Sequence, residues 1–179
     1  MPKKIVITGG PSTGKTSLIK FLIKEGHQCM NEISRQVTIE AQKEGIEQLF
    51  LTDPLLFSQK LIEGRLKQFL ATKDLKKTFL FYDRGLPDVT AYMDFKNEKY
   101  PDSFVNICTN NRYDTVFLLP PWKEIYQQDN ERYESFEEAQ EIYYYLVKGY
   151  QKYGYDIMEV PTGNVKNRTH FILEKLKII

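Results

Sequence analysis

The sequence predicts an α/β fold in which helices cover both faces of a parallel sheet of about five strands. Three apolar, β-prone runs, at 78–82, 115–119 and 156–160, alternate with segments whose apolar residues recur at helical spacing. A fourth run, Ile5–Thr8, leads into a glycine-rich loop, and residues 28–31 provide a brief further strand. Strands that alternate with helices favour parallel sheets covered on both faces, so these runs predict a three-layer sandwich.

Apolar spacing and capping residues predict the helices. We expect one helix directly after the glycine-rich loop, one beginning near Ile33, one from Pro54 to about Ala71, one through 142–153 and one through 165–179. Asp53 before Pro54 is typical of a helix cap followed by a first-turn proline.

Composition limits the classes of function. The chain has 179 residues, enough for one domain over 1–179, and its 25 Lys and Arg balance 24 Asp and Glu. This balance provides no global field that would attract long nucleic acids or an anionic membrane, whereas a protein or lipid partner stays open.

Cys29 and Cys108 lie far apart and are expected to be free thiols in a reducing compartment. With no signal peptide and no transmembrane segment in sight, we expect a cytoplasmic protein.

The loop after the first strand carries the most specific signal in the chain. Residues 9–16 fit G-x-x-x-x-G-K-[ST], the Walker A pattern, in the strand–loop–helix context that this pattern requires. Glycines let the backbone wrap around an anion, and amide groups at the helix start point at phosphate oxygens. The residues expected to bind the nucleotide are Gly9, Gly10, Pro11, Ser12, Thr13, Gly14, Lys15, Thr16 and Ser17. The sequence therefore predicts a P-loop NTPase sandwich that binds a nucleoside triphosphate.

A metal site is expected beside this loop. Lys15 places a cation on the terminal phosphates, and the Thr16 hydroxyl is placed to bind Mg²⁺. Asp83 ends the third apolar run, at the same edge of the sheet, where its carboxylate can reach that ion or its waters. The alternative for Asp83 is a turn-forming carboxylate. Arg84 can either brace the transferring phosphoryl group or pair with an acidic neighbour, and the sequence does not decide between these roles.

Glu32 and Arg35 follow the second predicted strand, at the carboxyl edge of the sheet. A carboxylate there can take a proton from an acceptor hydroxyl, while the arginine binds an anion or the new phosphate. The alternative is an ordinary exposed ion pair on a helix.

The segment 120–136 is expected to be a helical lid. Its many carboxylates would repel a triphosphate unless its few cations point inward, which makes Arg132 the candidate for a catalytic lid arginine that stabilises charge on the phosphoryl group. The alternative is an arginine paired with its acidic neighbours on a solvated surface.

Taken together, these residues resemble the NadR-like group of small P-loop proteins, often labelled AAA-family ATPases but nearer in architecture to nucleoside and nucleotide kinases. The resemblance covers nearly the whole chain. The residues that carry it are Gly9 to Thr16, Glu32-x-x-Arg35, Asp83-Arg84-Gly85 with Pro87-Asp88, Asp129-x-x-Arg132, and Val160-Pro161 leading to Arg168.

This resemblance implies a phosphotransferase. Similar kinases phosphorylate a ribose hydroxyl and place a Glu after the second strand and a carboxylate-Arg pair after the third, positions that Glu32 and Asp83-Arg84 match. We therefore expect a kinase that uses ATP and Mg²⁺ on a small nucleoside- or riboside-type acceptor. Another branch of the group resembles a GTP-binding trafficking factor, so the alternative is a slow ATPase or GTPase that acts as a nucleotide-gated regulator. The chain lacks the N/T-K-x-D and D-x-x-G motifs of ordinary GTPases, which favours ATP.

Overall fold

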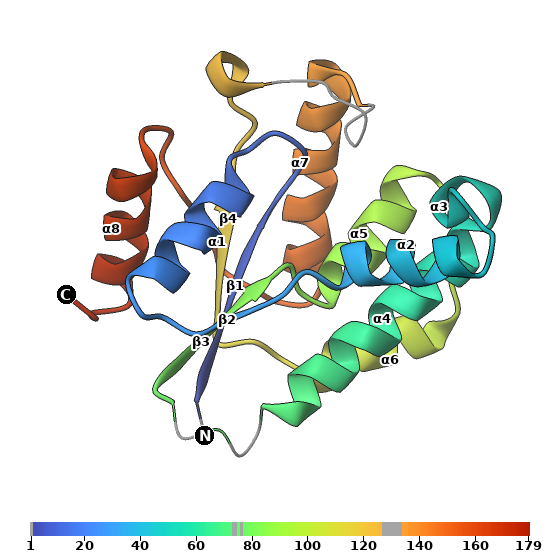
Figure 1. Cartoon of the computed structure of the whole chain (residues 1–179), viewed down its shortest axis with the longest axis horizontal. Coiled ribbons are helices and arrows are strands. Elements are labelled where there is room, and N and C mark those ends of the chain that lie inside the picture. The colour runs from blue at the N-terminus through green and yellow to red at the C-terminus, as the bar shows by residue number, and fades with distance from the viewer. Residues whose placement is uncertain (1, 73–74, 76, 127–133) are drawn as a thin grey trace.

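The computed structural model describes residues 2–72, 75, 77–126 and 134–179. Within these residues each strand is followed by one or more helices along the chain (Figure 1). They are β1 (Lys3–Gly9), α1 (Lys15–Lys24), β2 (Cys29–Met30), α2 (Ile33–Lys43), α3 (Leu49–Thr52), α4 (Pro54–Ala71), β3 (Phe79–Asp83), α5 (Pro87–Phe95), α6 (Asp102–Asn110), β4 (Thr115–Leu119), the 3-10 turn η1 (Lys123–Ile125), α7 (Phe136–Lys152), β5 (Ile157–Glu159) and α8 (Val165–Lys175).

The strands form one parallel sheet of five in the order β2-β3-β1-β4-β5. Ile7 of β1 pairs with Asp83 at the end of β3, and Gly9 pairs with Leu119 at the end of β4. The carboxyl ends of these three strands therefore meet at one edge. This architecture confirms the predicted α/β sandwich with a parallel sheet.

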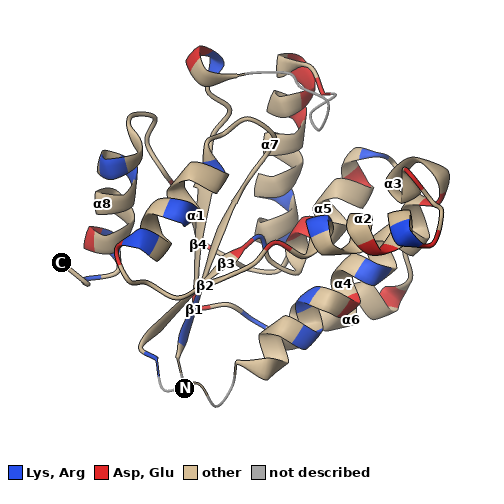
Figure 2. Cartoon of the chain, in the orientation of Figure 1, with Lys and Arg blue, Asp and Glu red and all other residues tan. Residues whose placement is uncertain are grey.

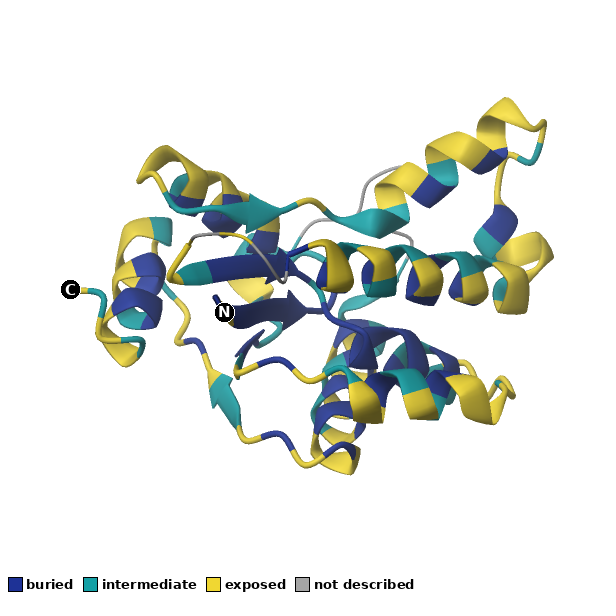
Figure 3. Cartoon of the chain, turned by 90° about the horizontal axis from the view of Figure 1, so that it is seen from below, coloured by how far each residue is buried: buried dark blue, intermediate teal, exposed yellow. Residues whose placement is uncertain are grey.

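Alternating side chains of the central strand pack against helices on opposite faces. Ile5 and Ile7 join the apolar side chains of α1 and α8, whereas Val6 joins those of α4, α5 and α7. Figure 1 shows α1 and α8 together on one side of the sheet and the remaining long helices on the other. The central strands β1, β3 and β4 are mostly buried, the edge strands β2 and β5 are less so, and the helices turn their exposed faces outward (Figure 3). Both faces of β1 are thus covered, as its apolar run predicts.

Capping explains where the longest helices begin. In α4, Asp53 accepts a hydrogen bond from the backbone of Leu56 at 2.9 Å, with Pro54 in the first turn, as the sequence predicts. In α7, Ser135 and Glu138 form a capping box, which starts this helix at Phe136, before the apolar pattern that begins at residue 142. The short helices α3, α5 and α6 were not anticipated. No helix in the described part of the chain is long and apolar enough to cross a membrane.

The chain leaves β1 in one direction for β2 and β3, and β4 and β5 lie on the other side of it. Such a reversal of strand order opens a crevice outside the carboxyl ends of the strands, where open α/β sheets bind their ligands. The glycine-rich loop follows β1, the strand at which the order reverses, so it lies where such a ligand is expected.

Candidate active site

The phosphate loop, residues 9–16, connects β1 to α1 and depends on close backbone approach. A Cβ added to Gly9 would lie 2.9 Å from the carbonyl oxygen of Leu119 and 3.0 Å from the hydroxyl of Thr13. Gly14 has a φ of 77°, in the left-handed region that favours glycine, and is the last residue before α1. The loop therefore takes the compact shape that lets successive amide groups converge on an anion.

Lys15 and Asp83 form a buried ion pair at the end of this loop. The ammonium of Lys15 donates to Asp83 Oδ1, and the two side chains are only 7% and 9% exposed. The pair joins the first turn of α1 to the end of β3 and holds the lysine at the carboxyl edge of the sheet. Lys15 is thereby held where the terminal phosphates of a nucleotide are expected.

The Thr16 hydroxyl and the Asp83 carboxylate are hard oxygen donors of the kind that Mg²⁺ prefers. Thr16 follows Lys15 directly and is exposed at the start of α1, while Asp83 contacts Lys15. No group of three or more His, Cys, Asp or Glu residues suited to a metal exists among the described residues. Because Mg²⁺ is held by one or two protein ligands plus phosphate and water, these two residues fit it as a partner of the nucleotide.

Glu32 and Arg84 form a second ion pair beside the first, with Arg84 Nε donating to Glu32 Oε1 at 2.9 Å. Glu32 is the N-cap residue of α2, and Arg84 follows β3 with a φ of 71°. Burial alone would raise the pKa of the Glu32 carboxyl, but the charges of Arg84 and Lys15 outweigh it and hold that pKa well below its usual range. Glu32 therefore remains a carboxylate at neutral pH and into mildly acidic solution.

Arg84 itself stays charged for related reasons. Burial would lower the pKa of its guanidinium, but the Tyr92 hydroxyl and the carboxylates of Glu32, Asp88 and Asp83 raise it well above its usual value. Of the two roles open for Arg84, the structure confirms pairing with acidic neighbours, because it also contacts Asp88 at 3.4 Å. Its link to the transferring phosphoryl group stays a prediction.

Asp88, in the first turn of α5, organises the backbone behind Arg84. Its carboxylate is 1% exposed and accepts hydrogen bonds from the hydroxyls of Thr8 and Tyr150 and, at 2.8 Å, from the backbone N–H of Gly85. These donors come from β1, α7 and the segment after β3. One carboxylate therefore joins the central strand to α7 and to the segment after β3.

Comparison with protein-family models identifies the group to which this architecture belongs. Residues 4–168 match the family model described as an AAA domain. The chain belongs to this AAA domain family. No curated protein matches it in sequence.

Solved structures similar in fold to this AAA domain protein include a deoxyadenosine kinase and the NadR protein. The deoxyadenosine kinase of M. mycoides with the products dCMP and dCDP bound has a TM-score of 0.72 at 18% identity, over 98% of this chain and 100% of the kinase. The NadR protein in complex with NR has a TM-score of 0.75 at 16% identity, over 99% of this chain but 50% of the NadR chain. The AAA domain protein thus spans about half the length of NadR. At these identities the likeness shows the fold, which is that of P-loop kinases.

Two other residues predicted for the site of the AAA domain protein are exposed. Arg35 is exposed in the first turn of α2, and Ser17 is exposed on α1. Arg132 lies outside the described residues, so its role in a lid stays a prediction. Acidic residues do gather at the first turn of α7, where Glu137 and Glu138 lie (Figure 2).

Cys29 and Cys108 are free, as expected, and burial raises the pKa of both thiols to about 12.

Two buried arginines received no role from the sequence, although Arg168 is among the residues that carry the resemblance. Arg65 of α4 donates to the carbonyl of Gly85 at 2.9 Å, and Arg168 of α8 donates to the carbonyl of Thr13 at 2.8 Å. Both are 3% exposed. Each lies on the apolar face of its helix, four residues before Phe69 and Ile172, respectively. A cation at a core position of an amphipathic helix is the signal that could have found them.

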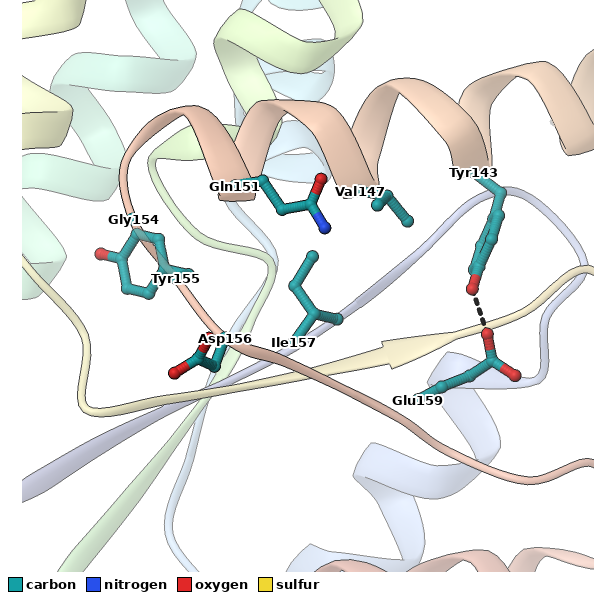
Figure 4. A pocket seen from close by; sticks show the side chains of 8 residues that line it. All are labelled: Tyr143, Val147, Gln151, Gly154, Tyr155, Asp156, Ile157 and Glu159. Atoms are coloured by element: carbon teal, nitrogen blue, oxygen red, sulfur yellow. Dashed lines mark hydrogen bonds between the residues drawn. The ribbon is translucent and has the colours of Figure 1, made fainter.

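A hollow elsewhere on the AAA domain protein has no part in this site. It has a volume of about 600 Å³ and lies between α7 and the edge strand β5 (Figure 4). Tyr143 donates to Glu159 across one end of it. None of its lining residues belongs to the phosphate loop or to the two ion pairs, so we do not assign the acceptor to this hollow.

Proposed function

We propose that this chain is a kinase that transfers the γ-phosphoryl group of ATP to a hydroxyl of a small nucleoside- or riboside-type acceptor. The observation that carries the proposal is the meeting of a buried ion pair, Lys15–Asp83, with a partly buried one, Arg84–Glu32, at the carboxyl edge beside the phosphate loop. The charge of Lys15 lowers the pKa of Glu32, and the charge of Asp83 raises the pKa of Arg84. The two pairs are therefore electrostatically coupled.

In the proposed reaction, the amide groups of the loop and the Lys15 ammonium bind the β and γ phosphates. Thr16 and Asp83 would hold Mg²⁺, which supplies charge neutralisation between these phosphates when it is bound. Phosphoryl transfer breaks the bond to the bridging oxygen of ADP and forms a bond to the acceptor oxygen. The residues of this chain contribute mainly by positioning and by charge.

Glu32 is proposed to orient the acceptor hydroxyl. Its carboxyl side chain is 29% exposed, so it remains accessible while Arg84 holds one of its oxygens. The low pKa of Glu32 makes it a weak base, which suits a loose transition state in which the attacking hydroxyl needs little activation. The hydroxyl proton passes to Glu32 as the new O–P bond forms, and then to solvent.

The acceptor class is inferred from similar folds. Deoxyadenosine kinase structures contain dCMP, dATP or dCTP, and NadR structures contain NR or NAD with AMP-PNP. Nucleosides and ribosides share a ribose-type hydroxyl and a base or base-like ring. These neighbours support a search for the acceptor of this chain among such compounds.

The proposal is tested by ATP turnover with and without a panel of nucleosides, ribosides and nucleoside monophosphates, followed by mass analysis. We expect one compound to gain a phosphate in a one-to-one ratio with ADP, and Glu32→Gln to lose that gain. Glu40→Gln is the matched control, because Glu40 is an exposed glutamate on the same helix that accepts from Gln36 at 2.9 Å. Slow hydrolysis to phosphate alone across the panel would favour a nucleotide-gated regulator instead.

A further inference from the structure

Arg168 lies directly behind the phosphate loop. Its Nη1 atom donates to the carbonyl oxygen of Thr13 at 2.8 Å, although 155 residues separate the two in the chain. A Cβ added to Gly14 would lie 2.8 Å from the same Nη1 atom. The second glycine of the motif therefore leaves room for this arginine in addition to providing the left-handed backbone.

The charge of Arg168 is not balanced by any carboxylate in the described part of the chain. The residue is 3% exposed, and its Nε and Nη2 atoms are buried without a hydrogen-bond partner. The guanidinium lies 6.0 Å from the ring of Trp122, which offers only a weak cation–π contact. Burial lowers the pKa of the guanidinium. A buried cation without a counter-ion is costly, so another group is expected to supply the negative charge.

The contact with Thr13 shows where that charge would act. The Thr13 carbonyl and the Gly14 N–H belong to one peptide unit, so a cation bound to the oxygen polarises the N–H on the other side. Loop amides are the groups that donate to phosphate oxygens. A polyanion held by the loop would thus be attracted by Arg168 both through this peptide and through space.

We propose that Arg168 is a positioning residue for nucleotide binding, whose buried charge polarises the Thr13–Gly14 peptide and is neutralised by the phosphates of a bound nucleoside triphosphate. The inference rests on the proposed function, because it assumes that this loop binds such a ligand. A purely structural arginine behaves differently. Its loss lowers stability and ligand affinity together, whereas loss of an unbalanced buried charge spares the ligand-free protein and weakens the complex.

Two substitutions separate charge from hydrogen bonding. Arg168→Gln keeps a donor for Thr13 but removes the charge, and Arg168→Lys keeps the charge. Arg112→Gln is the matched control, since Arg112 also donates to backbone carbonyls, those of Tyr153 and Gly154, and lies 4.4 Å over the ring of Tyr155, away from the loop. The measurements are titration calorimetry with ATP in EDTA, which prevents turnover, and the melting temperature of each ligand-free protein.

We expect Arg168→Gln to raise the Kd for ATP about tenfold, with a ligand-free melting temperature no lower than that of the parent. Arg168→Lys should bind ATP within about threefold of the parent, and Arg112→Gln should match the parent. Unchanged ATP affinity in Arg168→Gln would overturn the inference, as would a lowered melting temperature or failure of that variant to fold. If the parent protein itself binds no ATP, the proposed function is wrong. That result is seen in the parent, whereas failure of the inference about Arg168 is seen only when the variants are compared with a parent that binds ATP.

Discussion

The buried carboxylate of Asp88 offers the sharpest test of how this crevice is held together. Three donors from separate elements converge on it, the Thr8 hydroxyl, the Tyr150 hydroxyl and the Gly85 N–H, in addition to the longer 3.4 Å contact from Arg84. Asp88→Ala removes their common acceptor while the donors stay buried. Each buried donor left without a partner costs about 1–3 kcal/mol. Because Tyr150 and Thr8 can partly turn away, we expect a loss of about 3–5 kcal/mol in the free energy of unfolding rather than the full sum.

Urea denaturation measures this loss. With a slope of about 2 kcal/mol per molar urea for a chain of this size, the unfolding midpoint should fall by roughly 1.5–2.5 M, without a change in slope. Asp88→Asn keeps the shape but turns an amide nitrogen toward donors, so we expect an intermediate loss of about 2 kcal/mol.

The control for this measurement is Asp94→Ala on the same helix. Asp94 is half-buried and accepts from the hydroxyl of Tyr100 at 2.9 Å, so its loss should cost about 1 kcal/mol or less. The reasoning is refuted if the midpoints of Asp88→Ala and Asp94→Ala coincide. A double-mutant cycle with Tyr150→Phe would then show no coupling between the hydroxyl and the carboxylate.

Three further predictions concern the ion pairs. Lys15→Ala should abolish ATP binding or turnover in calorimetric and coupled assays, because it removes the cation beside the β and γ phosphates; unchanged affinity and turnover would contradict its role. Asp83→Asn should shift the Mg²⁺ titration midpoint of turnover more than it changes ATP affinity in EDTA, and coincident titration curves would make Asp83 a structural residue only. Arg84 lowers the pKa of Glu32, so the parent should show no loss of turnover from Glu32 protonation between about pH 8 and 5, whereas Arg84→Met should gain such an acid limb. The depressed folded-state pKa means that the stability from Glu32 is present above its unfolded pKa of about 4.3 and is lost as pH falls through the folded value. Identical pH profiles for the two proteins would refute this coupling.

Local patterns in the sequence were sufficient for the scaffold and for the position of the glycine-rich loop between a strand and a helix. The apolar runs identified the strands, and Asp53-Pro54 located the start of α4 at the residue where the structure begins it. Residues 9–16 identified the phosphate loop, because strand, glycine spacing and helix act over a few neighbouring residues. The sequence did not predict helix α5, because most of its residues are buried: Pro87, Asp88, Val89, Thr90, Ala91 and Met93. A helix covered on most sides shows no amphipathic period.

The partners of the charged residues were decided by tertiary structure. The sequence placed Glu32 and Arg35, three residues apart, at the same edge of the sheet, but it gave no indication that Glu32 pairs with Arg84, 52 residues away, as the structure shows. Arg168 lies behind the phosphate loop only because α8 packs beside α1 on one face of the sheet. Periodicity and capping report on contacts within a turn or two of the chain, whereas pairing between charges depends on which strands are neighbours and how deeply each side chain is buried. The strand order β2-β3-β1-β4-β5 therefore set which charges meet, and burial set how strongly they interact.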